Sequence, residues 1–316
     1  MPNLNRSFRP NALLLESRET PAIVSAVGAE PGQPGMVIAY DEFHHELFRV
    51  APYGVGFTGG VRAVVADVNG DGSPDLITAP GNGTTPTVVV IDGTTFLELT
   101  RFDTYESTFT GGVNLDAADL NNDGFAEIIT GADIGGGPRV RVLDGTTVAS
   151  GTPEAIADFI AIEDPKFRGG VRIAAGDLNG DGVADLVVGA GKGGGPRVAG
   201  LDGVALGEGR KIKIFADFYS FAPGLREGTQ LDIRDVTSDG VNDLVFSGSS
   251  ISRERFINGA HGSFNIPTYD LTNNPEQFPV MEYAIFDIAY PTYENGVLLD
   301  QLIPIATAAH FTPVMP

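Results

Sequence analysis

The sequence predicts an all-β fold assembled from repeated units of four short strands. Three observations lead to this prediction: glycine accounts for 42 of the 316 residues, one acidic motif occurs four times, and no stretch shows the sustained 3.6-residue apolar period of a helix. Abundant glycine with only 19% charged residues suits short strands joined by tight turns. The 42% of hydrophobic residues is sufficient for a large core.

The acidic motif is the clearest repeat. It reads Asp-x-Asn-x-Asp-Gly-x-x-Asp, with small variations, and its copies begin at Asp67, Asp119, Asp177 and Asp235. The flanks repeat as well. Phe-x-Gly-Gly-Val precedes three copies, at 57–61, 109–113 and 167–171, and Gly-Gly-Gly-Pro-Arg-Val follows two of them, at 135–140 and 193–198. Because the flanks recur with the motif, the repeating element is a whole structural unit rather than one loop.

Each unit is predicted to contain four strands. In the first clear unit these are residues 61–66, 75–79, 88–91 and 96–102, and Gly, Pro, Asn or Asp residues bound each run. Runs of this length between such residues are typical of strands and turns.

A fainter unit lies upstream. Residues 21–26 resemble 74–79, and residues 36–41 resemble 88–92. Its acidic loop is absent, and the three acidic positions are held by Leu14, Arg18 and Ala22. The chain therefore has five units, four with an intact loop. Four-stranded units that recur every 50 to 60 residues or so are typical of propeller blades, which predicts a five-bladed β-propeller.

These motifs together resemble FG-GAP and VCBS repeats, a family that includes the propeller of integrin α-subunits and many bacterial surface and secreted proteins. The clear match covers residues 57–248, with a fainter match over 21–56, whereas 249–316 departs from the pattern. The resemblance implies one propeller domain over 21–316, a bacterial extracellular or cell-surface location, and adhesion to a protein or glycan partner on one propeller face. The expected oligomeric state is a monomer.

The N-terminal segment, residues 1–20, contains Leu-Glu-Ser-Arg at 15–18. This run resembles a leader found before repeat domains in some bacterial exported proteins. The alternative is a terminal strand. The apolar run at 12–15 is shorter than that of an ordinary secretory signal, so the sequence leaves the export route open.

The acidic loops are predicted to hold calcium. Oxygen atoms at alternate positions of a tight loop can converge on one hard cation, and a ligand set without Cys or His favours calcium over zinc. The candidate ligands are the side chains at positions 1, 3, 5 and 9 and the backbone carbonyl at position 7. They are Asp67, Asn69, Asp71, Ser73 and Asp75; Asp119, Asn121, Asp123, Phe125 and Glu127; Asp177, Asn179, Asp181, Val183 and Asp185; Asp235, Thr237, Asp239, Val241 and Asp243.

One calcium ion per loop gives four sites, and the fourth is expected to be the weakest because Thr237 replaces asparagine. Magnesium is disfavoured because it demands a tighter octahedron. The competing interpretation is a metal-free turn rich in Asp and Asn.

Several functions are disfavoured. A formal net charge of −21 argues against nucleic acid as a partner, because phosphates would be repelled. The sequence has no run of 18 apolar residues, so no transmembrane helix is predicted. It also has no cysteine, so bound metal is a candidate for the stabilising role that disulfides have in other proteins. Since no GxSxG motif occurs and no Ser/His/Asp set can be argued from spacing, no catalytic residue is assigned. A binding module is favoured; the alternatives are a polysaccharide lyase or hydrolase and a structural spacer.

Two further sets of repeated residues are candidates. Arg139 and Arg197 hold equivalent places, either as donors to an anionic glycan or partner carboxylate or as edge-strand residues bonded to a neighbouring blade. The repeated phenylalanines are expected in the core between blades rather than in a ligand platform; they are Phe57, Phe109 and Phe167.

Closure of the ring is the last prediction. A propeller must pair its final blade with its first or leave two sheet edges exposed. Residues 296–303 share a glycine start and an apolar run with 170–175, so they are predicted to form the inner strand of the first blade. The competing closure uses residues 11–17.

Overall fold

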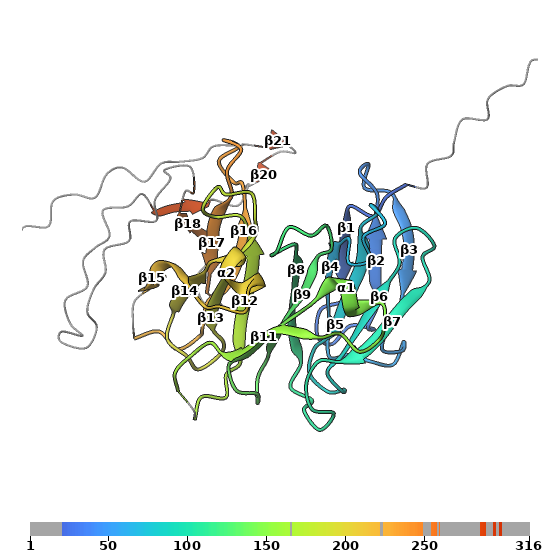
Figure 1. Ribbon diagram of the computed structural model, residues 1–316, viewed down its shortest axis with the longest axis horizontal. Coiled ribbons are helices and arrows are strands. Elements are labelled where there is room, and N and C mark those ends of the chain that lie inside the picture. Colours follow the sequence, from blue (N-terminus) through green and yellow to red (C-terminus); the bar gives the residue numbers. More distant parts are fainter. Residues whose placement is uncertain are drawn as a thin grey trace, which may run out of the picture.

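The computed structural model describes residues 21–164, 166–221, 224–248, 254–257, 259, 285–288, 293–294 and 297–298. Within them, five antiparallel sheets follow one another in chain order and lie side by side (Figure 1). The innermost strands of neighbouring sheets are in contact: β4 (Val61–Ala66), β8 (Val113–Ala118), β12 (Val171–Gly176) and β16 (Gln230–Arg234). This is the arrangement of a five-bladed β-propeller, as the sequence predicted.

The remaining strands complete the blades outward. Blade I holds β1 (Ser25–Gly28), β2 (Val37–Tyr40) and β3 (Glu46–Val50); blade II continues with β5 (Asp75–Pro80), β6 (Thr87–Ile91) and β7 (Glu98–Asp103). Blade III continues with β9 (Glu127–Ala132), β10 (Arg139–Leu143) and β11 (Ala155–Ile160), and blade IV with β13 (Asp185–Ala190), β14 (Arg197–Leu201) and β15 (Lys213–Tyr219). Blade V continues with β17 (Asp243–Ser247), β18 (Glu254–Ile257) and β19 (Ile285–Ile288).

The four strands predicted for the first clear unit are confirmed, with ends that shift by at most two residues. The described residues contain only two short helices, α1 (Gly145–Val148) and α2 (Gly203–Gly207), as the lack of helical periodicity indicates. Each helix begins at the glycine of an Asp-Gly pair, and its N-cap is the aspartate of that pair, Asp144 or Asp202.

The core lies between the blades. Every residue of β5, β9 and β13 is buried, because these second strands have a neighbouring strand on each side and a neighbouring blade on each face. In one cluster, Ile77 and Val88 of blade II pack with Val113 and Leu115 of blade III. Fully burying an aliphatic side chain of this size contributes about 1.5–3 kcal/mol, so the inter-blade contacts hold the ring together.

The register of blade I corrects one sequence alignment. Ser25 lies opposite Tyr40 in the β1–β2 pair, as Leu76 lies opposite Ile91 in the β5–β6 pair. Ser25 therefore corresponds to Leu76, and the alignment of residues 21–26 with 74–79 is wrong by two positions. The match of Pro21 with Pro74 suggested that alignment, but both prolines lie outside the strand pairing and so do not report its register.

Strand β1 is consequently the counterpart of β5, and blade I has no counterpart of β4 among the described residues. The predicted closing segment lies largely outside those residues. Its described part, Val297–Leu298, forms β21, which pairs with β20 (Tyr293–Glu294) in a two-stranded sheet. Residues 299–303 and the competing segment 11–17 lie outside the described residues, so the closure stays a prediction.

Candidate functional site

The four acidic loops connect the first and second strands of blades II to V. Their polar side chains fold back onto the loop backbone. In the first loop, Asp67 accepts hydrogen bonds from the N–H groups of Gly70 at 2.7 Å and Gly72 at 2.8 Å, and Asn69 accepts from Asp71 at 2.9 Å. Gly72 has φ +84°, a conformation that favours glycine. The spacing of the motif thus produces one tight turn lined with oxygen atoms.

The position-7 residues lie inside these turns. The N–H of Ser73 donates to the position-5 carboxylate of Asp71 at 2.8 Å. The same contact recurs at 2.9, 2.9 and 3.0 Å in the other loops, from Phe125, Val183 and Val241. Ligation of a metal by the carbonyl groups of these residues stays a prediction.

The closing acids differ from the other loop acids because they are buried. The exposed fraction is 0% for Asp75, Glu127 and Asp243 and 1% for Asp185. Each closing acid accepts a backbone N–H from its own loop; Asp75 does so from Val68 at 3.1 Å and Asp185 from Leu178 at 3.1 Å. The salt bridges found between described residues include none of these four acids.

Burial changes the acidity of the closing acids. It raises the pKa of Asp75 and Asp185 to about 6 and that of Glu127 to about 7. Backbone N–H donors oppose this rise, whereas the negative charge of nearby loop acids adds to it: Asp71 acts on Asp75, and Asp123 on Glu127. Each of these buried carboxyl groups is therefore costly to ionise without a cation nearby.

A further acid joins the loop in three blades, and the sequence analysis missed it. In blade III, carboxylate oxygens of Asp123, Glu127 and Asp144 lie within 4.8 Å of one another. The counterpart in blade II, Asp92, accepts a hydrogen bond from Asn69 at 3.3 Å. The available signal was the Asp-Gly pair that ends the third strand at 92–93, 144–145 and 202–203, which we interpreted only as a turn.

The fourth loop has a poorer set of oxygen atoms. The hydroxyl of Thr237 lies 3.4 Å from oxygens of both Asp235 and Asp243, in place of the longer amide of the other loops. At the position of Asp92 the sequence has Asn258.

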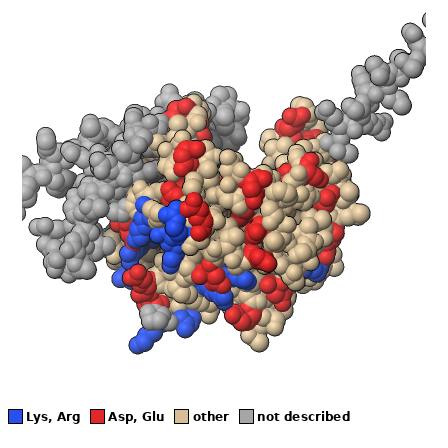
Figure 2. All heavy atoms as spheres, viewed as in Figure 1, with Lys and Arg blue, Asp and Glu red and all other residues tan. Residues whose placement is uncertain are grey.

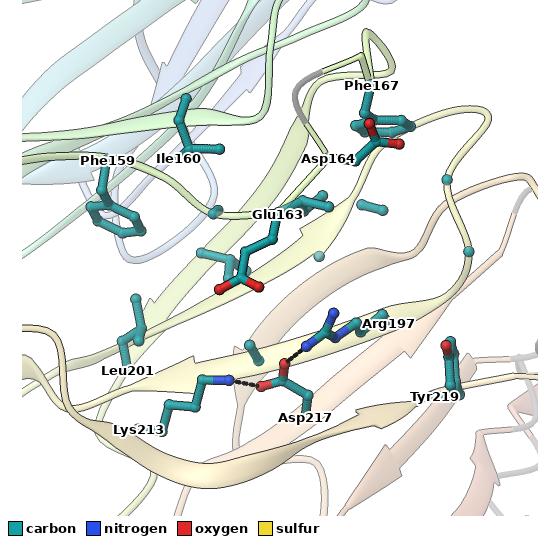
Figure 3. Close-up of a pocket in the computed structure, with 18 of the residues that line it drawn as sticks. Phe159, Ile160, Glu163, Asp164, Phe167, Arg197, Leu201, Lys213, Asp217 and Tyr219 are labelled. Carbon is teal, nitrogen blue, oxygen red and sulfur yellow. Dashed lines mark hydrogen bonds and ion pairs between the residues drawn. The ribbon is translucent and has the colours of Figure 1, made fainter. Parts of the chain in front are cut away.

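The groove between blades III and IV contains a cavity of about 480 Å³ (Figure 3). Its walls come from the end of β11 and the following turn on one side and from β13, β14 and β15 on the other. Asp217 lies at its floor, bonded to Lys213 at 2.5 Å and to Arg197. Glu163 reaches into the space between Phe159 and this charged group. The cavity thus combines cations, carboxylates and aromatic rings.

The repeated arginines and phenylalanines occupy this groove and its counterparts. Arg139 pairs with Asp158 of its own blade and with Glu106 in the turn after blade II, whereas Arg197 pairs with Asp217 of its own blade. The expected bond to a neighbouring blade is therefore found for Arg139, through Glu106, but Arg197 pairs within its own blade. Both arginines lie on third strands, which have a paired strand on each side, so the expected edge-strand position is wrong. Phe57 and Phe109 pack against the core as expected, but Phe167 lines the open cavity.

Comparisons with known proteins agree with this architecture. An FG-GAP-like repeat matches residues 56–130, and an FG-GAP repeat matches residues 169–202. No curated protein matches the sequence. Among the described residues, no helix is long and apolar enough to cross a membrane.

The solved structures that match this chain include two lyases and a lectin. The exotype rhamnogalacturonan lyase YesX is 17% identical, with a TM-score of 0.44 over 72% of this chain and 48% of the lyase. The rhamnogalacturonan lyase of Bacillus licheniformis is 17% identical, with a TM-score of 0.42 over 66% and 47%. A lectin of Agrocybe aegerita that recognises non-reducing terminal N-acetylglucosamine is 17% identical, with a TM-score of 0.45 over 73% and 58%.

The present chain thus spans about half of each lyase. Similarity at this level says nothing about what the chain binds. The repeat matches and the five successive sheets give the assignment: the chain is a five-bladed β-propeller that contains FG-GAP repeats at 56–130 and 169–202.

Proposed function

We propose that this propeller is stabilised by calcium and acts outside the cell by binding a glycan or protein partner, without catalysis. The observation that carries the calcium part is the burial of four closing acids, each beside further loop acids and without a Lys or Arg partner among the described salt bridges. Carboxylates gathered in this way repel one another unless a cation lies between them.

The donor set fits calcium. Each loop offers carboxylate oxygens together with an amide or hydroxyl oxygen, and in blades II to IV the Asp of the Asp-Gly pair adds a further carboxylate. Calcium accepts six to eight oxygen ligands in flexible geometry, which suits a loop that also supplies backbone carbonyls. The ion would neutralise the buried acid and tie the loop between the first and second strands to the turn after the third strand. We expect the fourth site, where Thr237 replaces asparagine, to lose calcium first.

The extracellular location rests on two arguments. FG-GAP repeats are typical of extracellular proteins, and the millimolar calcium found there fills even loop sites of modest affinity. Fractionation of the producing cells tests the location; native protein confined to the cytoplasm would contradict it.

The binding role is supported by a departure from repeat symmetry. A propeller that served only as a spacer would need no cavity lined by charged and aromatic side chains, whereas the groove between blades III and IV has one. A glycan array and a pull-down from cell surfaces, both in calcium, test this role. We expect at least one saturable ligand, bound by a monomer in sedimentation experiments. Release of shortened or unsaturated sugars from polysaccharides would instead favour an enzyme.

A further inference from the structure

In most of the grooves between blades, an aromatic side chain fills the space. Tyr53 reaches across from the end of blade I and donates its hydroxyl to the carbonyl of Thr87 at 2.9 Å. Tyr105 does the same from the end of blade II, to Thr130 at 3.0 Å and to Arg139 at 3.1 Å. Both rings are largely buried. Each tyrosine thereby fills its groove and fastens one blade to the next.

The backbone identifies the counterpart of this tyrosine in each groove. In blades II to IV, the residue before it donates its N–H to the carbonyl group of the proline that precedes the third strand of the same blade. The donors are Thr104 at 3.0 Å, Ala161 at 2.8 Å and Ser220 at 2.8 Å. The next residues along the chain, which occupy the place of the ring, are Tyr105, Ile162 and Phe221.

In the groove between blades IV and V, the ring is present without its hydroxyl. Phe221 is 6% exposed and packs edge-on against Phe246, with 5.6 Å between ring centroids. Only the groove between blades III and IV, among the four formed by described residues, has an aliphatic side chain at this place, Ile162. That groove is the one with the 480 Å³ cavity.

A neighbouring position in the same groove also carries a smaller side chain. Strand pairing makes Val188 the counterpart of Thr130, and Ala199 the counterpart of Arg141. In the groove between blades II and III, Arg141 extends a guanidinium to the carbonyl of Thr104 at 2.5 Å and so helps to close it. Ile162 and Ala199 thus stand where the groove between blades II and III has Tyr105 and Arg141. The groups that fill the space in that groove are missing here, and the cavity is open.

Positive charge gathers around this opening. All four lysines of the chain lie between residues 166 and 213, although the formal net charge is −21. Lys211 and Lys213 line the cavity with Arg197, and the ammonium group of Lys211 lies over the ring of Phe159 at 5.0 Å. Figure 2 shows the largest group of Lys and Arg in view on the side of α2 and β14, while acidic side chains are spread over the whole face, including beside this group.

We infer that this cavity is a binding site for an oligosaccharide that carries carboxylate groups. Lys211 and Lys213 supply cations for the sugar carboxylates, and the side chains of Phe159 and Phe167 that line the cavity supply apolar surface for a pyranose ring. The carboxylates of Glu163 and Asp217 accept hydrogen bonds from sugar hydroxyls. This assignment rests on the proposed function, and it specifies the class of glycan.

An acidic peptide is the main competitor, because it could use the same lysines. The lining carboxylates disfavour it: Glu163 and Asp164 are exposed beside the cations and would repel a chain with a charge on every residue. Sugar hydroxyls, in contrast, need acceptors of this kind. The mixture of acceptors, cations and rings therefore favours a saccharide with spaced charges.

The test uses the full chain in calcium and isothermal titration with a hyaluronan hexasaccharide, in which every second sugar is a glucuronate. We expect saturable binding that the methyl-esterified hexasaccharide lacks. Lys211→Gln combined with Lys213→Gln should weaken binding by about ten-fold or more, the loss expected for a charge-assisted contact. Lys192→Gln is the matched control, because this exposed lysine is not part of the cavity lining, and it should bind like the parent.

Closing the cavity gives an independent test. Ile162→Tyr restores the ring found in the grooves before blades II and III and should abolish hexasaccharide binding while the melting temperature stays the same or rises. Equal binding by the parent, the Ile162→Tyr variant and the double lysine variant would overturn the assignment of the cavity but leave the proposed glycan binding intact. Absence of hexasaccharide binding, or tighter binding of hexaglutamate, would also overturn the assignment, whereas the glycan array and pull-down decide the proposed function separately.

Discussion

The carboxylate of Asp75 accepts a hydrogen bond from the backbone N–H of Gly93 at 2.8 Å, which ties the first acidic loop to the turn after β6. The same contact recurs at 3.0 Å from Gly203 to Asp185 and from Gly259 to Asp243. The closing acid therefore joins two turns of its blade through backbone donors, in addition to any metal that it holds.

The closing acid accepts backbone hydrogen bonds and is also a predicted calcium ligand, so replacing it should have a different effect from replacing an exposed loop acid. Asp185→Ala should lower the free energy of unfolding in EDTA by about 2 kcal/mol, because the buried N–H groups of Leu178 and Gly203 lose their acceptor. Asp181→Ala removes an exposed acid and should change the free energy of unfolding in EDTA by less than about 0.5 kcal/mol. Both should remove one calcium site. Urea unfolding in EDTA measures the difference, and equal losses for the two variants would contradict it.

The pH dependence of the chelated protein follows from the raised pKa values. Burial raises the pKa of Asp75 and Asp185 to about 6 and of Glu127 to about 7. A carboxyl group whose pKa is higher in the folded state binds protons more readily there, so protonation favours folding. In EDTA the free energy of unfolding should therefore fall as pH rises from about 4 to 7.

Calcium should reverse this trend, because it binds the ionised carboxylates and competes with protons. Thermal melts at pH 5 and pH 7.5, with EDTA and with calcium, give the comparison. A chelated protein that is more stable at pH 7.5 than at pH 5 would show that the buried acids are not the controlling groups.

The centre of the propeller depends on one carboxylate shared by three blades. Asp133 of blade III pairs with Arg62 of blade II and with Arg172 of blade IV, and its side chain is only 8% exposed. Asp133→Asn should cost about 3 kcal/mol, since it leaves two close guanidinium groups without a counter-charge. The matched control is the exposed pair of Glu98 and Arg101, where Glu98→Gln should cost less than about 1 kcal/mol. Similar costs for both variants in urea unfolding would contradict this.

The sequence was sufficient for features that depend on residues close together in the chain. Blade number, strand positions and loop structure follow from turn residues and acids at short, fixed spacings, so repeats such as 67–75 and 177–185 predicted them. The register of β1 was missed because it depends on pairing with Tyr40 across the sheet, and a nearby proline gave a false alignment.

The site was predicted only in part, for the same reason. Asp144 joins Glu127 from 17 residues away, and its Asp-Gly pair looked like an ordinary turn. The open groove depends on Ile162, Val188 and Ala199, which meet only when two blades pack together. None of these residues is unusual by itself. Their significance appears only when each is compared with its counterpart in the other grooves.

Closure of the ring remains open to a direct test. Blade I begins with β1, the counterpart of a second strand, and its inner strand stays a prediction. We expect deletion of residues 295–316 to lower the melting temperature and promote aggregation, because it would expose the edge of β1. A shorter deletion of 305–316 is the matched control and should have little effect. A protein lacking 295–316 that stays soluble and melts like the parent would instead favour closure by residues 11–17.

The most direct test of the account is calcium binding by the intact chain. Isothermal titration should find about four ions per chain, and each independent site should add roughly 2.7 kcal/mol of stability when free calcium is about 100 times its dissociation constant. The combined change Asp177→Ala and Asp181→Ala should remove one ion, and EDTA should lower the melting temperature of the parent. An unchanged melting temperature in EDTA, with no calcium bound, would contradict the account.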